Sequence, residues 1–555
     1  MLSVLIIWAV ALVIFAILGR AGLRLLYGNN NIFEKAYDTD IVFGICICNL
    51  YAQIFSIFVP VGALAFIGVM ILTIVAGIYL YTGKDMFPGL RTDIKSFKNW
   101  KISFICFAIV IGAALWTVIT PQHYDTYLYH AQAIRWIEEY GIVPGLGNLH
   151  YRFAYNSSYM TLQALFSFKW LTGQSFHVMN GFITVFMLLY VLNTILQRED
   201  KRIKTSDLFK LASLVYILYD CRNISSPNTD TVALLLAYYI LIKWSEYSER
   251  DDKDVLGYSM LCILVVYVTT IKLSVGIFVL LVIYPAEIFI KEKRIGDIVR
   301  HLTAGVTILV PYIVRGIIIS GYILYPYEAT AVKSLDWIMP EFLLEIDKKE
   351  IIAWGRGHSD VNRIPEHIWQ WVGGWFSSIN ILWKVLMIIS VIALIYIGIW
   401  ILRQRKRVSF SPQLCMALTC IIGLFFWLFS APLPRYGVIY MTSIPCLAIS
   451  VFLLDHEIKL DNEKIIGLFK YTVIGVYIII FIAYSYVFDL GIPKIIRQSD
   501  YDNKPTYTVS SSGIDYAIPS ELDLAGYDPF PETPHANTAE LIKLRGNDLK
   551  DGFKY

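Results

Sequence analysis

The chain has 555 residues, of which 57% are hydrophobic and only 16% are charged, and its mean hydropathy is +0.57. A water-soluble domain cannot bury so large an apolar share, so these values indicate a membrane protein. The net charge of +3 is an average over both membrane faces and therefore gives no reason to expect a nucleic-acid partner.

Apolar runs recur along the chain and define its expected spans. Runs of about 18 to 22 uncharged residues are long enough to cross a hydrocarbon core of about 30 Å. The sequence therefore predicts an all-α polytopic membrane protein with about 14 transmembrane helices, embedded in a lipid bilayer. The expected spans are 2–19, 41–60, 61–81, 102–119, 176–196, 208–220, 229–244, 255–272, 275–290, 302–320, 379–402, 413–430, 436–454 and 465–488.

The distribution of Lys and Arg predicts the orientation of these spans. Arg20 and Arg24 follow the first span, which favours a retained first helix with its amino end outside. The 56 residues 120–175 contain only three basic residues apart from histidine, whereas the expected inner loops are rich in them. The positive-inside rule therefore places 120–175 on the outer face.

The spans and loops divide the chain into six parts. Two large external loops and an external tail separate three groups of helices. The expected parts are 1–119 (N-terminal transmembrane helices), 120–175 (first large external loop, catalytic), 176–320 (transmembrane helices), 321–378 (second large external loop), 379–488 (C-terminal transmembrane helices) and 489–555 (a small external appendage of turns and short strands).

The first external loop carries the polar residues around which a site is expected. Apolar residues at helical spacing between Leu128 and Ile137, followed by Gly141, predict a short amphipathic helix at the membrane surface. A second segment, Tyr159 to Leu171, is too short for a crossing and is expected to be an interfacial or re-entrant helix. The two surface helices would flank Asp125.

Asp125 lies directly before the first of these helices, between His123 and His130. Such an aspartate is often an N-cap that accepts a backbone N–H, and a histidine such as His130 often bridges to a backbone carbonyl. A carboxylate with histidine neighbours at the edge of a membrane is also a candidate acid–base group. Both interpretations stay open on spacing alone, as does snorkelling at the surface for Arg135 and Arg152.

This loop contains an acid at the outer end of an early span, then Tyr-x-Tyr-His, Arg-Trp, Gly-Ile-Val-Pro and Arg-Phe-Ala-Tyr-Asn-Ser-Ser. In this order the motifs resemble the first external loop of the GT-C membrane glycosyltransferases, with closest likeness to a branch found in bacterial surface-polysaccharide gene clusters. The acid pair of several GT-C subfamilies is missing, because Thr126 follows Asp125. Further short patches in the same order lie at 225–230, 270–274, 315 with 320–326, 431–436 and 544–553.

The resemblance implies a GT-C-like helical bundle that transfers a sugar from a polyprenyl-phosphate-linked donor to a glycan or lipid-linked acceptor. It places the reaction on the periplasmic or external face of a bacterial inner (plasma) membrane, with inversion at the anomeric carbon. Such a reaction needs a proton acceptor and cations that oppose the charge on the leaving phosphate. The resemblance makes Asp125 the catalytic base, and the expected substrate-binding residues are His130, Arg135 and Arg152 for the acceptor, Lys272 and Arg435 for the carrier phosphate, and Arg222 and Arg315 at other outer span ends.

The cations have an alternative role, because each can instead snorkel or pair with a local acid such as Asp220 or Asp230. No cofactor is certain from the sequence. A divalent cation is possible, although the acids and histidines of the second external loop match no metal-binding spacing. The tryptophans of that loop suit sugar stacking and also suit a membrane interface, which we favour for most of them.

Two other classes of function use the same features. A polymerase of polysaccharide repeat units would act on a diphosphate-linked glycan at the same face. A flippase or other transporter of lipid-linked sugars would be no enzyme, and such proteins often contain two related halves. We find no internal repeat, and the polar residues gather at one face, which favours the enzyme.

Overall fold

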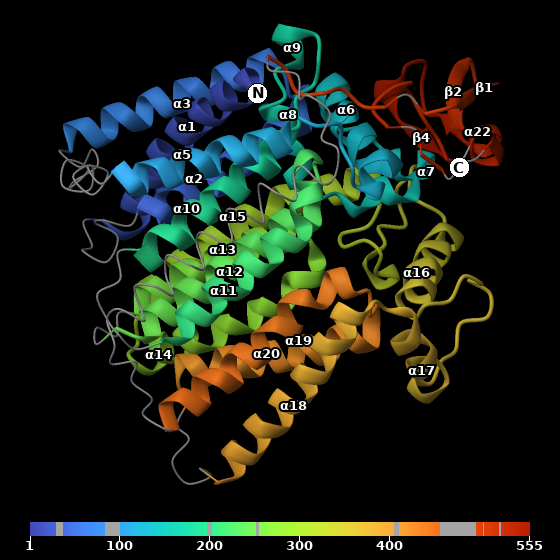
Figure 1. Ribbon diagram of the computed structural model, residues 1–555. Coiled ribbons are helices and arrows are strands. Elements are labelled where there is room, and N and C mark those ends of the chain that lie inside the picture. Colours follow the sequence, from blue (N-terminus) through green and yellow to red (C-terminus); the bar gives the residue numbers. More distant parts are fainter. Residues whose placement is uncertain are drawn as a thin grey trace.

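The computed structural model describes residues 1–28, 37–83, 100–196, 203–250, 255–403, 410–455 and 496–555, except positions 503, 521, 522, 525 and 535. Helices run side by side over most of this length (Figure 1). Eight helical segments of the described part are long and apolar enough to cross a membrane, so the protein is a multi-pass membrane protein. They are α1 (Leu2–Tyr27), α2 (Tyr37–Phe58), α3 (Ala63–Thr82), η6 (Leu273–Val282) continued by α14 (Ile283–Lys291), α15 (Ile295–Ser320), α18 (Ile381–Arg403), α19 (Pro412–Ser430) and α20 (Pro434–Asp455).

Every expected span that falls on described residues coincides with helical structure, while 465–488 lies outside the described residues. Five helices at expected spans are shorter or less apolar than the eight above, so the total of 14 stays a prediction. These five are α5 (Trp100–Thr117), α10 (Met179–Leu196), α11 (Thr205–Asp220), α12 (Thr229–Ser248) and α13 (Val255–Ile271).

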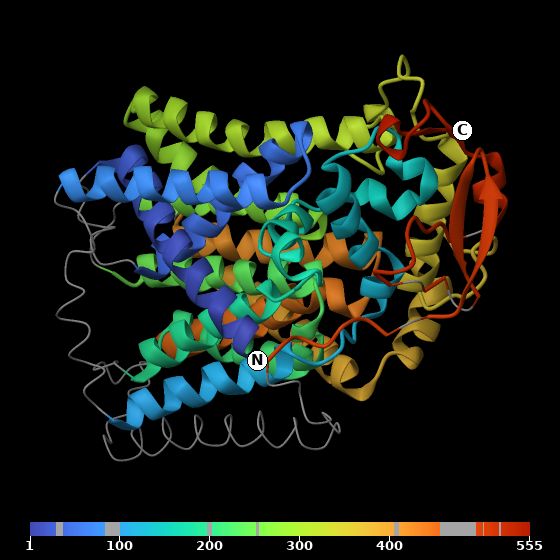
Figure 2. The ribbon, with the colours of Figure 1, turned by 90° about the horizontal axis from the view of Figure 1, so that it is seen from above.

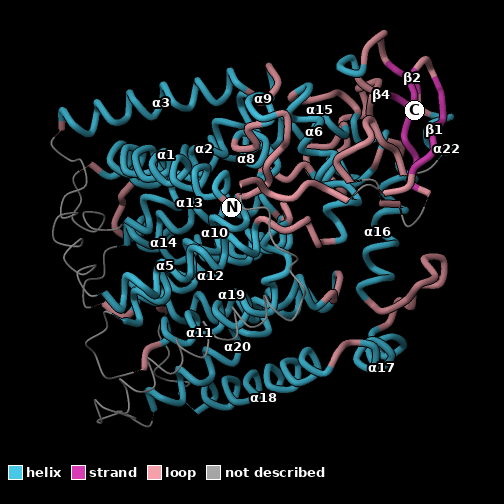
Figure 3. The backbone as a smooth tube through the Cα atoms, turned by 45° about the horizontal axis from the view of Figure 1, so that its top comes forward, coloured by secondary structure: helices cyan, strands magenta, loops and turns pink. Residues whose placement is uncertain are grey.

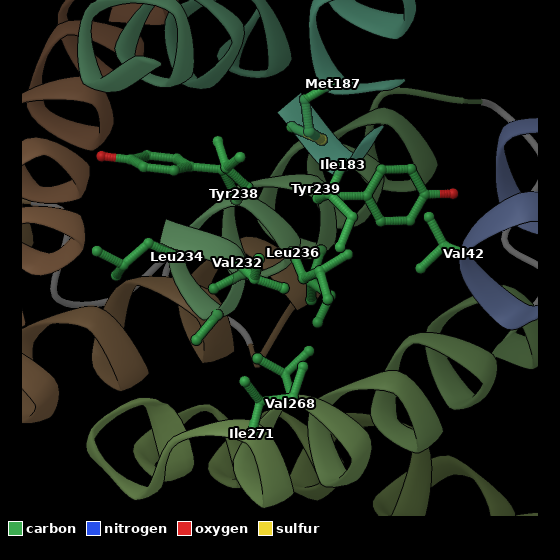
Figure 4. Packing of buried hydrophobic residues seen from close by; sticks show 14 of the residues in the cluster. Val42, Ile183, Met187, Val232, Leu234, Leu236, Tyr238, Tyr239, Val268 and Ile271 are labelled. Carbon is green, nitrogen blue, oxygen red and sulfur yellow. The ribbon is translucent and has the colours of Figure 1, made fainter. Parts of the chain in front are cut away.

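Helix α12 forms the centre of the bundle. Every residue from 229 to 245 is buried, as expected of a helix surrounded by other helices on all sides. Figure 4 shows its side chains between those of the neighbouring helices, with Val42 from α2, Ile183 from α10 and Val268 from α13. This central position fixes the first turn of α12, which carries Asp230.

Two glycines bring α1 and α2 into close contact. A Cβ atom at Gly19 would lie 1.7 Å from the backbone oxygen of Asp40, and one at Gly44 would lie 1.9 Å from that of Phe15. Small residues at such crossings let two backbones approach, which is the usual way in which membrane helices pack.

The two large loops and the C-terminal tail gather at one end of the bundle (Figures 1 and 2). The first loop forms η3 (Thr126–His130), α6 (Ala131–Tyr140), α7 (Leu146–Leu149), η4 (Tyr151–Tyr155), α8 (Tyr159–Leu165) and α9 (Lys169–Thr172). The segment before α12 forms η5 (Cys221–Ser225), and the second loop forms η7 (Glu328–Thr330), α16 (Glu341–Gly355) and α17 (Ile368–Ser378).

The second surface helix expected from the sequence is only partly at the surface. All residues of α8 are buried, because the helix packs against α2 and α6, and only α9 is exposed. The polar residues of this segment have partners inside: Thr161 Oγ1 donates to Asn49 Oδ1 at 2.9 Å, and Asn49 Nδ2 donates to Ser158 Oγ at 3.2 Å. A buried asparagine on α2 therefore draws the segment into the protein.

The described part of the C-terminal tail contains short strands and packs against both loops. It contains β1 (Thr506–Ser511) paired antiparallel with β2 (Ile514–Pro519), then α22 (Ala536–Leu541), β3 (Lys543–Leu544), η8 (Leu549–Asp551) and β4 (Phe553–Lys554), which pairs with β3. Figure 3 shows these strands at the same end of the bundle as α16. The backbone N–H of Phe553 donates to the backbone oxygen of Pro144 at 2.9 Å. Arg545 forms an ion pair with Asp336, with 3.0 Å between Nε and Oδ2.

Candidate functional site

A short loop after α5 carries His123 and Asp125, and a neighbouring segment holds it in place. The backbone N–H groups of Gln122 and His123 both donate to Ser226 Oγ, at 2.9 and 3.0 Å. Ser226 lies between η5 and α12, so the loop is attached to the central helix of the bundle. The expected surface helix then begins as η3 and continues as α6.

The Asp125 carboxylate forms an ion pair and does not cap the helix that follows. Its side chain makes no capping hydrogen bond to η3, which answers the question that the sequence left open. Its Oδ2 lies 3.2 Å from Arg435 Nη1, at the start of α20. Asp125 is buried, which by itself raises the pKa of its carboxyl group, but Arg435 and, after it, His123, His130 and Lys272 together outweigh burial and hold that pKa well below its usual range. The group is therefore ionised at neutral pH.

A second buried acid lies beside Asp125. Asp230 occupies the first turn of α12, where the Asn228 side chain caps the helix by accepting its N–H at 2.8 Å. A carboxylate is favoured there because the helix N-terminus carries partial positive charge. Asp230 forms an ion pair with Lys272, which precedes η6, and lies 3.6 Å from Arg435 Nε.

The side chains of the two acids are more deeply buried than those of the two cations. The side chains of Asp125 and Asp230 are 12% and 6% exposed, whereas those of Arg435 and Lys272 are 38% and 21% exposed. Tyr436 underlies both cations, with its ring centre 4.3 Å from Lys272 Nζ and 5.1 Å from Arg435 Cζ. We call Asp125, Asp230, Lys272 and Arg435 the charge cluster; its formal charges balance, and its positive groups are the more accessible ones.

Two neutral histidines flank the charge cluster. Burial lowers the pKa of His123 to about 4, and it lowers the pKa of His130 well below its usual value. His123 Nδ1 accepts the N–H of Asp125 at 3.2 Å, so its ring proton is on Nε2. The two rings are stacked with centres 6.2 Å apart, and neither ring nitrogen of His130 has a hydrogen-bond partner among the described residues. His130 therefore does not bridge to a backbone carbonyl.

His123 and the two acids of the charge cluster form the only grouping in the described residues with metal-ligand geometry. Ligand atoms of His123, Asp125 and Asp230 all lie within 4.8 Å of one another. Both carboxylates already face a cation, however, and His123 uses Nδ1 to accept a backbone N–H. A divalent ion bound here would take the place of Arg435 and Lys272 at the two acids.

Arg152 belongs to a neighbouring pair that the sequence did not predict. Its Nη2 lies 3.1 Å from Glu350 Oε2 on α16, and its guanidinium lies over the Trp354 ring at 5.1 Å. Tyr151 donates to the same carboxylate oxygen at 2.7 Å. Glu350 joins the second large loop to the first, a contact that no local pattern in the sequence reveals.

The other expected site residues lie in different surroundings. Arg135 forms an ion pair with Asp528 and donates to the Tyr527 backbone oxygen at 2.9 Å, so it holds the tail. Arg222 is exposed on η5. Arg315 is buried near the end of α15, where Nη1 donates to Ser56 Oγ and Nε donates to Asn156 Oδ1 at 3.3 Å.

The tryptophans of the second loop divide between the core and the surface. Trp371 and Trp375 are buried, whereas Trp354 and Trp369 are exposed. The structure thus brings Asp125, His130, Lys272 and Arg435 together from three distant parts of the chain. His123 and Asp230 complete the group. The signal for Asp230 in the sequence was an acid at the start of an otherwise uncharged run.

The fold and the charge cluster define a multi-pass membrane protein with a buried, charge-balanced site at one end of its helices. The family described as "Domain of unknown function (DUF8201)" matches residues 1–442, and the chain belongs to this family. No curated protein matches the chain. No solved structure matches it either.

Proposed function

We propose that the protein is a membrane glycosyltransferase of the GT-C type, acting at the outer face of a bacterial inner membrane. It moves a sugar from a polyprenyl-phosphate-linked donor to a hydroxyl group of a glycan or lipid-linked acceptor. The observation that carries this proposal is Asp125: a buried and ionised carboxylate that caps no helix and is held by a cation at the end of the helical bundle.

In the proposed reaction the acceptor hydroxyl attacks the anomeric carbon of the donor. Asp125 takes the hydroxyl proton, the new carbon–oxygen bond forms on the face opposite the phosphate, and the anomeric configuration is inverted. The bond between the anomeric carbon and the phosphate oxygen breaks, and its electron pair leaves with the carrier phosphate. Lys272 and Arg435 oppose the charge that develops on this phosphate, because their side chains are the more exposed members of the charge cluster.

Arg435 has a second role in this scheme. A buried aspartate without a cation nearby would take up a proton and could not act as a base. The ion pair at 3.2 Å keeps Asp125 ionised at the cost of lower basicity. Proton transfer to Asp125 is therefore expected to accompany formation of the new bond and not to precede it.

The test uses membranes that contain the full chain, a panel of polyprenyl-phosphate hexoses with a radioactive sugar, and cell-envelope glycan as acceptor. Wild-type membranes should transfer the label and release polyprenyl phosphate, whereas Asp125→Asn should reduce transfer at least about 100-fold, as expected for loss of a general base. Asp336→Asn is the matched control, because Asp336 is exposed and pairs only with Arg545 among the described residues. Equal transfer by wild type and Asp125→Asn would refute the proposal.

The same experiment separates the two alternatives. Label that accumulates as long polymer on the carrier would identify a repeat-unit polymerase. Label that crosses the bilayer still attached to its lipid would identify a flippase. The charge cluster lies at one end of the helices, which supports transfer at one face over transport.

A further inference from the structure

A cavity of about 220 Å³ lies beside the charge cluster, between the first external loop and α15. Lys272 and Tyr436 line it on the side of the cluster, and Arg315 and Arg152 line other parts of its wall. Most of the remaining wall is apolar or aromatic and includes Ile137 and other side chains of α6, η6 and α15.

The charges around this cavity are one-sided. Three cations line it, and no aspartate or glutamate does. Lys272 and Arg152 have carboxylate partners outside the lining, in Asp230 and Glu350. The cavity is therefore surrounded by positive charge, with its compensating carboxylates placed behind the cations.

Arg315 is the cation whose charge lacks a carboxylate partner among the described residues. It is 3% exposed, and its hydrogen-bond acceptors, Ser56 Oγ and Asn156 Oδ1, are both neutral. A buried guanidinium without a counter-ion is costly in a protein, and within a membrane-spanning helix it marks a functional site by default. An anion in the cavity would supply the missing charge.

Asn156 holds Arg315 in place for such a ligand. Its backbone has a positive φ of 49°, which asparagine tolerates better than most residues. In this conformation its Nδ2 donates to the Tyr312 carbonyl at 2.8 Å, while its Oδ1 accepts from Arg315 Nε. The amide thus ties Arg315 to its own helix and fixes the direction of the guanidinium.

We infer that this cavity binds the phosphate of an isoprenoid lipid, with Arg315 as the principal contact and Arg152 and Lys272 beside it. A guanidinium suits this role because it binds phosphate oxygens with two parallel hydrogen bonds. The volume is smaller than the roughly 300–1,000 Å³ of a typical pocket for a drug-sized ligand, so it fits a headgroup and the first carbons of a chain, not an oligosaccharide. The apolar wall suits those carbons.

This inference rests on the proposed function, because it assigns the phosphate of the sugar donor to that cavity. It also revises the phosphate contacts of the proposed reaction, Lys272 and Arg435, by leaving Arg435 as the partner of Asp125. Arg435 does not line the cavity and faces two carboxylates instead. Lys272 remains shared between the charge cluster and the cavity, which would place the phosphate next to Asp125.

The experiment measures binding without sugar transfer, using the purified full chain in lipid nanodiscs. The probes are farnesyl phosphate, farnesol and inorganic phosphate, and the readouts are affinity and the melting temperature with and without probe. Wild type should bind farnesyl phosphate at least 10-fold more tightly than either other probe. Arg315→Gln should weaken this binding at least 10-fold. Arg315→Lys should weaken it less, because lysine keeps the positive charge but cannot donate two parallel hydrogen bonds to the phosphate.

The melting temperature separates a binding role from a structural one. Arg315→Gln removes an uncompensated buried charge, so without probe it should melt at the same temperature as wild type or higher, and it should lose the increase that farnesyl phosphate produces. Arg545→Gln, a change in the tail, should behave as wild type. Unchanged affinity in Arg315→Gln, or equal binding of farnesol, would overturn the inference, and equal binding of inorganic phosphate would show a site for free anion instead.

Failure here and failure of the proposed function give different results. If the inference fails alone, Asp125→Asn still abolishes transfer while Arg315→Gln leaves lipid-phosphate binding intact. If the proposed function fails alone, Arg315-dependent binding of farnesyl phosphate is found in a protein that transfers no sugar.

Discussion

Replacing Arg435 with glutamine should make the activity sensitive to acid. The change removes the cation that lies 3.2 Å from Asp125 and leaves two buried carboxylates, Asp125 and Asp230, with Lys272 alone. Burial and the second acid both favour the protonated form of Asp125, so its pKa should rise. The base must be ionised to act, and the rate should therefore increase with pH through this new pKa and fall below it.

The size of the effect can be estimated from a buried aspartate elsewhere in the chain. Asp347 on α16 accepts hydrogen bonds from Tyr155 at 2.5 Å and Tyr325 at 3.1 Å, and burial nevertheless raises its pKa to about 6. With Lys272 still nearby, the pKa of Asp125 in Arg435→Gln should rise toward the value of about 6 that Asp347 has. Much of Asp125 would then be protonated at pH 5, whereas nearly all of it would be ionised at pH 7.5.

The assay is the initial rate of sugar transfer between pH 5 and pH 8. The wild-type rate should not fall toward pH 5 through protonation of Asp125, because Arg435 helps to keep the pKa of the Asp125 carboxyl group far below this pH range. In Arg435→Gln the rate at pH 5 should be severalfold lower than at pH 7.5, beyond any general loss of activity. Arg545→Gln controls for the loss of an arginine elsewhere. Parallel pH profiles for wild type and Arg435→Gln would show that Arg435 does not set the charge of Asp125.

Two further predictions concern the surroundings of Asp125. Ser226→Ala removes the acceptor for the N–H groups of Gln122 and His123, which should reduce the free energy of unfolding by about 1–3 kcal/mol and lower the melting temperature in nanodiscs; an unchanged melting temperature would contradict the anchoring role. Chelation of divalent ions should leave the transfer rate within about twofold of its starting value, because Arg435 and Lys272 already neutralise the two acids; a 10-fold loss that Mg²⁺ or Mn²⁺ restores would show that a metal ion replaces these contacts.

The helices follow from local properties of the sequence, and for that reason they were predictable. A run such as 381–403 has to satisfy its backbone hydrogen bonds internally in lipid, so length and hydropathy are sufficient to find it. The same reasoning was less complete for 159–171, which it left as an interfacial or re-entrant helix and whose first part, α8, is buried in the protein. The partner that buries α8, Asn49, lies on another helix more than 100 residues away.

The site was predictable only as separate residues. Asp125, Lys272 and Arg435 each stood out as a charge next to an apolar run, but their pairing depends on how α12, α13 and α20 pack together. Spacing also could not decide between cap and ion pair for Asp125. Contacts between the two loops, such as Arg152 with Glu350, and between loop and tail, such as Arg135 with Asp528, leave no local pattern.

The central claim is that the ionised Asp125 carboxylate accepts the proton of the sugar acceptor. Its most direct test is single-turnover transfer from a polyprenyl-phosphate hexose by purified protein in proteoliposomes, comparing Asp125→Asn with wild type. Donor binding is measured on the same samples. We predict that Asp125→Asn binds the donor with wild-type affinity and transfers the sugar at least about 100-fold more slowly. Transfer at the wild-type rate by a correctly inserted Asp125→Asn protein would contradict the mechanism.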